Sequence, residues 1–323
     1  MSATIFYKLA AIFLMVGIGY VAGRMRWLGD ERRGADPART LANAAFYIFV
    51  PALLFRTTAR IDLGAMPWGI LAAFFVPVLA MLLAIYVGQR RTRKAPPVAA
   101  PSVRAITASF GNSVQLGIPL AAALFGEAGL GLHVTVVSLH ALVLLTVLTA
   151  LVELDLARER AGGARLVDTL RTTLRNTLVH PVVLPVVAGM VWNATGLGLP
   201  PVVDEVLELL GSAVVPLCVV LIGMSLAYYG VRGGVRDAVM LTLFKLLLLP
   251  ALVLAVAYGA FGLRGLPLEV IVIMAALPVG SNALIFAQRY NALEAETTAA
   301  IVFSTIAFAL TAPLWLALLA WLR

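Results

Sequence analysis

The sequence predicts an all-α polytopic membrane protein in which ten transmembrane helices form two inverted five-helix repeats. Hydrophobic residues make up 62% of the 323 residues, charged residues make up 12%, and the mean hydropathy is +0.99. Soluble domains average about 45–50% apolar and about 25% charged residues. Ten apolar runs are long enough to cross a bilayer, and two of them, at corresponding places in the two halves, are interrupted by helix-breaking residues.

The predicted spans each have about the 17–25 residues that a bilayer requires. They cover residues 5–22, 41–58, 68–88, 106–127 and 131–152 in the first half, and 178–195, 206–229, 238–261, 268–290 and 297–322 in the second. The first run has the length of a signal peptide, but its positive charges, Arg24 and Arg26, follow the run. That order retains the segment as a helix whose N-terminus lies outside.

Basic residues are concentrated in alternate connections, most of all in 23–40, 89–105 and the polar stretch after residue 152. The positive-inside rule places these connections in the cytoplasm and both termini on the extracytoplasmic side of an inner or plasma membrane. Five spans before the central linker and five after it give the halves opposite orientations. We therefore expect a first repeat at 1–152, a cytoplasmic linker at 153–176 and a second repeat at 177–323.

The fourth and ninth spans are the interrupted ones. Proline and glycine weaken a helix and leave backbone N–H and C=O groups without their helical hydrogen bonds. Inside a membrane such groups are tolerated only where protein surrounds them or where they line a water-filled cavity. The residues expected at the crossover of the helices are Gly117, Pro119, Pro278 and Gly280. A second matched pair, Pro51 and Pro216, is expected to bend the second and seventh spans. Paired interrupted helices are the best indication in a sequence of a transporter's binding site.

Four motifs, in order and spacing, resemble the auxin efflux carrier family: FYIFVPALLF, GNSVQLGIPLAAALFGEAGL, VVPLCVVLIGMSL and ALPVGSNALIFAQRY. The resemblance covers essentially the whole chain. It implies that the fourth and ninth helices cross at their prolines beside the substrate, in a fold shared with sodium/proton antiporters and bile-acid symporters. Members carry auxin in plants and carboxylates such as malate or malonate in bacteria. This chain, without a long hydrophilic loop, is more similar to a compact bacterial member.

The resemblance also implies an elevator-like motion. Helices 3, 4, 5, 8, 9 and 10 would form the moving domain, helices 1, 2, 6 and 7 the scaffold, and two scaffolds would meet in a homodimer.

The polar residues at the two breaks suit an anion. Half-helix N-termini carry unpaired N–H groups and a positive dipole end, and amides add donors without a fixed charge. The candidate substrate-binding residues are Asn112, Ser113, Gln115, Ser281 and Asn282. The alternative is that these side chains only hydrogen-bond the broken backbone of the partner helix. Both interpretations stay open at this point.

Two ionisable residues inside spans are candidates for coupling, His140 and Lys245. Histidine titrates nearest physiological pH, but a packed neutral histidine is the alternative. For Lys245 there are two interpretations. Its ammonium binds the substrate or takes part in a structural ion pair, or its long side chain snorkels to the membrane interface. No acidic residue lies beside either break, which disfavours an antiporter that exchanges ions on a membrane carboxylate. An ion- or proton-coupled symporter or antiporter of the same fold nevertheless remains the alternative.

Other functional classes lack a sequence signature. The net charge of +8 arises from basic residues between apolar runs, where they set topology, so we expect no nucleic-acid partner. One cysteine and three scattered histidines predict neither a disulfide nor a metal site, and no nucleotide-binding loop indicates a cofactor. An integral membrane enzyme would need a nucleophile or an acid–base pair, and none is visible. A channel stays a third alternative, and the expected partners are the lipid bilayer and a small organic anion.

Overall fold

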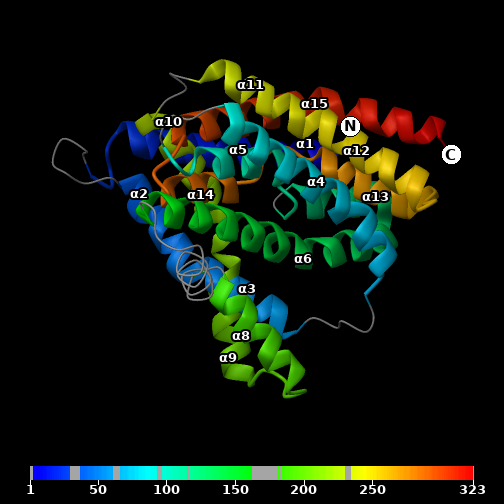
Figure 1. The fold of residues 1–323 in the computed structure, drawn as a ribbon, viewed down its shortest axis with the longest axis horizontal. Helices are drawn as coiled ribbons and strands as arrows, with labels where there is room; N and C mark the ends of the chain where they lie inside the picture. Colours follow the sequence, from blue (N-terminus) through cyan, green and yellow to red (C-terminus); the bar gives the residue numbers. More distant parts are fainter. Residues whose placement is uncertain are drawn as a thin grey trace.

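The computed structural model describes residues 3–29, 37–60, 66–92, 97–114, 116–161, 181, 183–229 and 234–322. In this part of the chain every regular element is a helix (Figure 1). The first half contains α1 (Ala3–Arg24), α2 (Pro37–Ala44), η2 (Ala45–Phe49), α3 (Val50–Ala59), α4 (Trp68–Thr92), α5 (Ala100–Ser109) and α6 (Gly117–Ala161). The second contains α8 (Val183–Ala194), α9 (Pro201–Ser212), α10 (Val214–Tyr229), α11 (Val235–Leu243), η3 (Phe244–Leu248), α12 (Leu249–Ala255), η4 (Val256–Ala260), α13 (Gly265–Ala276), α14 (Asn282–Arg289) and α15 (Glu294–Trp321).

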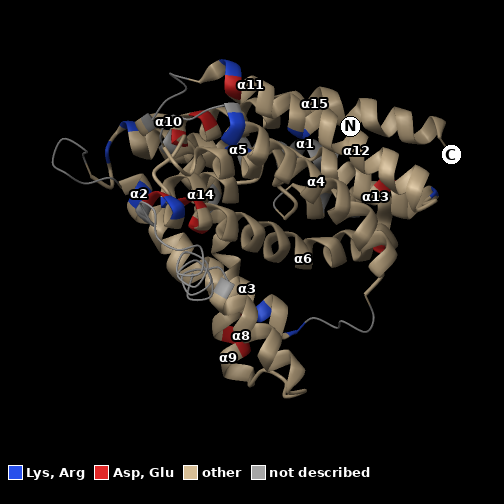
Figure 2. Cartoon of the chain, viewed as in Figure 1, with Lys and Arg blue, Asp and Glu red and all other residues tan. Residues whose placement is uncertain are grey.

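The protein is a multi-pass membrane protein. Among the described residues, 5 helical stretches are long and apolar enough to cross a bilayer, at 37–59, 68–91, 123–159, 235–260 and 294–321. Shorter apolar helices lie at 14–24, 184–194, 219–228 and 265–276. Charged residues gather near helix ends, and long uncharged stretches separate them (Figure 2).

The predicted helix boundaries differ from the observed ones in the middle of the chain. Gly126 has a left-handed φ of 63°, which glycine adopts without steric cost, and it separates the last part of the fourth span from the fifth inside α6. The helix then continues to Ala161, beyond residue 152 where the fifth span was predicted to end. The first residues of the predicted linker are therefore helical, and its remainder lies outside the described residues.

Prolines account for the irregular turns of two spans. Pro250 lacks an N–H, and the carbonyl of Leu246 one turn earlier accepts a hydrogen bond of 2.8 Å from the Trp315 indole instead. The π-helical segment η3 contains that carbonyl. Pro51 likewise follows the π-helical η2 directly, and Pro216 lies at the start of α10, just after α9 ends at Ser212. Both predicted kink positions therefore lie where one helical segment gives way to another.

Two pairs of helices pack unusually closely. A Cβ placed on Gly19 of α1 would lie 2.0 Å from the Val220 carbonyl oxygen of α10, and one on Gly223 of α10 would lie 1.9 Å from the Val16 carbonyl oxygen. Small residues let helix backbones approach in this way inside membranes. On α8, a Cβ at Gly189 would meet the Thr58 hydroxyl of α3 at 2.0 Å.

Arginines at the end of α3 hold α9 against it. Arg56 donates to Asp204 at 2.8 Å and to Glu208 at 2.6 Å, and Arg60 lies 3.0 Å from Asp204. The hydrogen bond from Arg56 is the main cause that lowers the pKa of the Asp204 carboxyl below its ordinary value. With α8, these helices form a projection at one side of the molecule (Figure 1).

Gly19→Ala is expected to lower the melting temperature of the detergent-purified protein. The added methyl group would force α1 and α10 apart, and overpacking of this kind costs about 1–3 kcal/mol. Gly17→Ala is the matched control, because a Cβ at that position of the same helix meets no atom within 4 Å. Equal melting temperatures for the two variants would contradict the close contact.

Candidate functional site

The two interrupted segments meet and pair their backbones. Gly111 and Val279 form an antiparallel bridge, the N–H of Asn112 donates to the Pro278 carbonyl at 2.8 Å, and the N–H of Gly280 donates to the Phe110 carbonyl at 2.9 Å. Each break thus satisfies groups that the other leaves without a helical partner. A membrane interior requires this, because it offers no water to unpaired amides.

Neighbouring helices complete the crossing. The N–H of Val279 donates to the Ser304 hydroxyl of α15 at 3.0 Å, and that hydroxyl donates in turn to the Ile301 carbonyl. A Cβ on Gly280 would lie 2.8 Å from the Gly111 carbonyl oxygen. Only glycine allows the two chains to approach so closely at this position.

Four helix ends surround the crossing. α5 and α13 end there, at Ser109 and Ala276, and α6 and α14 begin there, at Gly117 and Asn282. The beginning of a helix carries a partial positive charge and its end a partial negative charge. The crossing therefore has two electropositive helix ends and two electronegative ones.

Lys245 lies at one of the electronegative ends. Its side chain is fully buried, and its ammonium donates to the Ala275 carbonyl in the last turn of α13 at 2.5 Å. The same ammonium would lie 3.4 Å from a Cβ at Gly111. Of the two interpretations of this residue, snorkelling does not fit, because the side chain is fully buried and its ammonium is directed to the crossing.

Two histidines of α6 contact the first break. His133 Nε2 lies 2.8 Å from the Ser113 carbonyl oxygen, and His140 Nδ1 lies 3.4 Å from the Ser113 hydroxyl. Both side chains are buried, and the His140 ring packs on Phe110 with centroids 4.5 Å apart. The sequence analysis assigned no role to His133, although a spacing of seven residues from His140 places both on one helix face.

A pocket of about 120 Å³ opens beside the crossing. It is bounded by α3 and α10 on one side and by the two breaks and α6 on the other. Its polar lining comes from Thr57, Asn112, Ser113, Ser138, His140, Ser281 and Asn282, and its described lining residues include no lysine, arginine, aspartate or glutamate.

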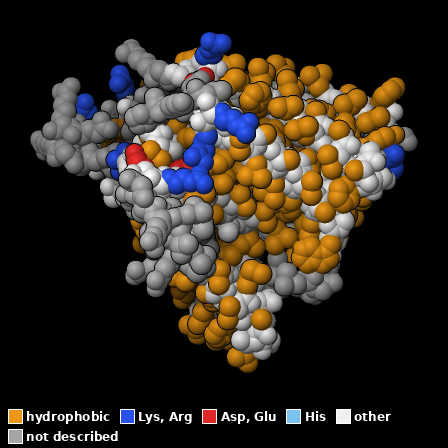
Figure 3. All heavy atoms as spheres, viewed as in Figure 1, with side chains coloured by type: hydrophobic (Ala, Val, Ile, Leu, Met, Phe, Trp, Pro, Cys, Tyr) orange, Lys and Arg blue, Asp and Glu red, His pale blue; other side chains and the backbone are white. Residues whose placement is uncertain are grey.

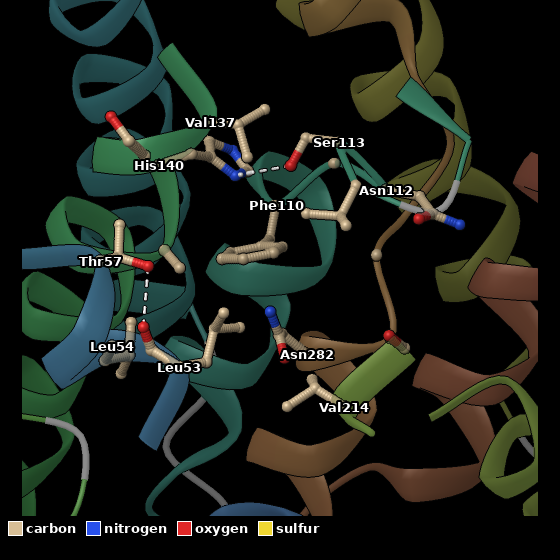
Figure 4. Close-up of a pocket in the computed structure, with 16 residues that line it drawn as sticks. Leu53, Leu54, Thr57, Phe110, Asn112, Ser113, Val137, His140, Val214 and Asn282 are labelled. Carbon is tan, nitrogen blue, oxygen red and sulfur yellow. Dashed lines mark hydrogen bonds between the residues drawn. The ribbon is translucent and has the colours of Figure 1, made fainter. Parts of the chain in front are cut away.

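The two asparagines lie differently in this pocket. The Asn282 amide points into the space between Leu53, Phe110 and Val214, whereas the Asn112 amide points away from Leu53 (Figure 4). Asn112 is buried and Asn282 half-buried. No hydrogen bond joins either amide to another residue in the described part of the chain.

The structure brings most of the predicted site residues together, though not all. Asn112, Ser113, Ser281 and Asn282 line one pocket, and Gly280 lies at the crossing itself. Gln115 lies outside the described residues. Pro278 contributes its carbonyl to the crossing, whereas Pro119 falls inside the first turn of α6.

A buried ionic cluster, which sequence analysis missed, holds α5 in place. Arg104 of α5 donates to both carboxylate oxygens of Glu296 at 2.8 and 2.9 Å, to Asp237 at 3.1 Å and to Gln89 at 3.2 Å. These partners belong to α15, α11 and α4. The cluster therefore ties four helices together two turns before the first break.

As for metal ligands, no group of three or more His, Cys, Asp or Glu side chains comes together among the described residues.

Helices that cross at paired breaks beside a pocket with amide and hydroxyl groups, in a multi-pass chain, are features of membrane transport proteins. The family model described as membrane transport protein matches residues 4–316. The chain belongs to this family, which is similar to the auxin efflux carriers, and it is a membrane transporter.

Several curated proteins are similar over part or most of their length. An "uncharacterized transporter" of Methanothermobacter thermautotrophicus is 26% identical over 94% of this chain and 95% of its own. Auxin efflux carrier component 8 of Arabidopsis thaliana is 24% identical over 60% of this chain and 64% of its own. Uncharacterized transporter YfdV of Escherichia coli K12 is 30% identical over 38% of each chain. The resemblance seen in the motifs is therefore confirmed.

Ser304→Ala is expected to destabilise the crossing. It leaves the N–H of Val279 without an acceptor, and an unpaired buried group costs about 1–3 kcal/mol. Thr305→Val is the matched control, because the Thr305 hydroxyl bonds only to the Ile301 carbonyl of its own helix. A lower melting temperature and faster hydrogen exchange around residue 279 in Ser304→Ala alone would support the described geometry, and similar behaviour of the two variants would refute it.

Proposed function

We propose that the protein is a secondary transporter of small organic anions, either carboxylates such as malate or malonate or auxin-like indole acids, that works by alternating access. One observation carries the proposal: a pocket that presents amide and hydroxyl groups, with no charged side chain among its described lining residues, lies beside two electropositive helix ends. The name of the Arabidopsis relative, an auxin efflux carrier component, supports an organic acid as substrate.

The pocket has the chemistry that a carboxylate requires. The starts of α6 and α14 favour negative charge, and the amides of Asn112 and Asn282 supply donors. Apolar side chains, among them Leu53, Val137 and Val214, form most of the lining of the pocket. Such a site stabilises an anion without a full counter-charge, so the substrate can also be released.

The size of the pocket favours the smaller candidates. Its volume of about 120 Å³ is several times the roughly 10–15 Å³ that a single water requires, but it is below the roughly 300–1,000 Å³ of pockets for drug-sized ligands. A short mono- or dicarboxylate therefore suits this conformation better than an indole acid.

For the mechanism, we propose ten spans in two inverted repeats with the pocket between a moving and a static part. Contacts support this division, since α1 packs mainly on α10 and α3 on α8 and α9, while α4, α5, α11–α13 and α15 pack among themselves. The pocket lies where the two groups face each other, with α3 and α10 opposite the breaks. Rocking or sliding of one group past the other would expose it to alternate sides.

A topology experiment tests the inverted repeat. In a Cys218→Ser background, cysteines introduced at Ala128 and at Glu159, both exposed residues of α6, should react with an impermeant thiol reagent from opposite sides of the membrane. The 31 residues between them correspond to about 46 Å of helix, more than the roughly 30 Å hydrocarbon core. Reaction of both cysteines from the same side of the membrane would contradict the proposed topology of ten spans.

An ion- or proton-coupled carrier of the same fold is the second candidate. Its support is His140, which lines the pocket, and Lys245, whose ammonium lies beside the crossing. Uptake into proteoliposomes under an imposed pH gradient, sodium gradient or membrane potential distinguishes these driving forces. Counterflow and saturation in the same vesicles separate a carrier from a channel.

Asn282→Ala and Asn112→Ala are each expected to weaken carboxylate binding. Loss of a donor to a buried anion costs about 1–3 kcal/mol, which corresponds to a roughly five- to 150-fold higher Kd. Asn282→Asp and Asn112→Asp should weaken binding further, because a like charge would lie beside the carboxylate where screening is poor. The measurement is a thermal-shift titration of the purified variants with malate, malonate and indole-3-acetate.

Ser109→Ala is the control for these variants. Its hydroxyl is buried just before the first break but bonds to the Ala105 carbonyl and does not line the pocket. Its affinity should match that of the unaltered protein. Unchanged affinity in all four asparagine variants would mean that the amides are structural and that the anion binds elsewhere.

A further inference from the structure

A second and larger hollow lies on the outer face of the helix bundle, away from the crossing. It is a groove of about 600 Å³ between α4 and the continuous stretch α11–η3–α12. Among the described residues that line it, Gln89 is the one with a polar side chain. Its lining comes from Ala80, Met81, Ala84, Ile85, Gly88, Gln89, Met240, Phe244, Leu248 and Leu252.

The two walls of the groove are unequal. The α4 wall presents Ala80, Ala84 and Gly88 at intervals of four residues, and a Cβ at Gly88 would meet no atom within 4 Å. The opposite wall presents longer side chains at the same interval, from Met240 to Leu252. The row of small residues on α4, which Met81, Ile85 and Gln89 of the same helix flank, leaves a channel beside the opposite wall that is open to the side. In a membrane protein that side faces hydrocarbon, so the groove has the shape and polarity for an acyl chain.

Each wall leads to an exposed arginine at the same end of the groove. Arg91 follows Gly88 by three residues on α4, and Arg236 precedes Met240 by four residues on α11, so each continues the groove face of its helix. The two helix ends lie at one level, because Arg104 hydrogen-bonds both Gln89 and Asp237. Figure 3 shows hydrophobic side chains over α4, α11 and α12, with Lys and Arg side chains at the border of this surface.

We propose that this groove binds an anionic phospholipid, with one acyl chain between α4 and α12 and the phosphate between Arg91 and Arg236. The α4 wall from Ala80 to Gly88 is about 12 Å long, which fits within one leaflet of a hydrocarbon core of roughly 30 Å. Basic residues at the membrane surface attract anionic lipid. Two arginines on separate helices make the site selective for the headgroup charge, and the groove makes it selective for a lipid over a soluble phosphate.

Native mass spectrometry of the protein, extracted from vesicles of equal phosphatidylglycerol and phosphatidylcholine, tests the site. We expect phosphatidylglycerol to be enriched on the unaltered protein and the enrichment to fall by up to roughly 25-fold in Arg91→Gln/Arg236→Gln, since each arginine contributes about a fivefold preference. Arg24→Gln/Arg264→Gln, which removes two other exposed arginines, is the matched control and should keep the enrichment.

A second pair of variants tests the groove itself. Ala84→Leu/Gly88→Leu fills the α4 wall with side chains that meet open space, so the protein should fold, and it should lose the retained lipid of both headgroups. Inorganic phosphate added at millimolar concentration should not displace the lipid. The proposal is overturned if the unaltered protein shows no enrichment, if both arginine pairs lower it equally, or if filling the groove changes only the oligomeric state.

Discussion

The structure depends on one constraint, that a helix broken inside a membrane must find partners for the backbone groups it frees. Two breaks meet here, and they hydrogen-bond each other through Phe110–Gly280 and Asn112–Pro278. Neither break would be tolerated alone, because an unpaired amide in hydrocarbon costs several kcal/mol. This mutual requirement explains why helix-breaking residues occur in both halves and why Gly280 lies where the chains are closest.

Side chains around the crossing contact the backbone groups that the pairing of the two breaks does not use. Ser304 accepts from Val279, His133 lies against the Ser113 carbonyl, and Lys245 donates to the end of α13. Ser304 and Lys245 come from helices that pack against the crossing, and His133 comes from the part of α6 that follows Gly126. The crossing is therefore held by a shell of polar side chains, and the pocket forms on the one side where α3 and α10 face it.

Sequence reasoning predicted the elements governed by local rules. Proline and glycine indicated both breaks and the helix change just before Pro51, and long apolar runs indicated the spans. It could not predict contacts between distant residues, such as Arg104 with Glu296, which are 192 residues apart. Lys245 shows the same limit, because a count of residues from the helix end gives depth but not direction. The π-helical η3 and the end of α13 set that direction, and neither is visible in the local sequence.

The charge arrangement at the pocket bears on how a transported anion would be released. A full cation in a poorly screened site would hold a carboxylate strongly. Here Lys245, the charged side chain beside the crossing, is directed to the Ala275 carbonyl and does not line the pocket. The starts of α6 and α14 contribute partial positive charge, the ends of α5 and α13 contribute partial negative charge, and neutral amides supply the hydrogen bonds. On the proposed function, the anion would be balanced by dispersed partial charges, which bind it specifically but weakly enough for each transport cycle to end in dissociation.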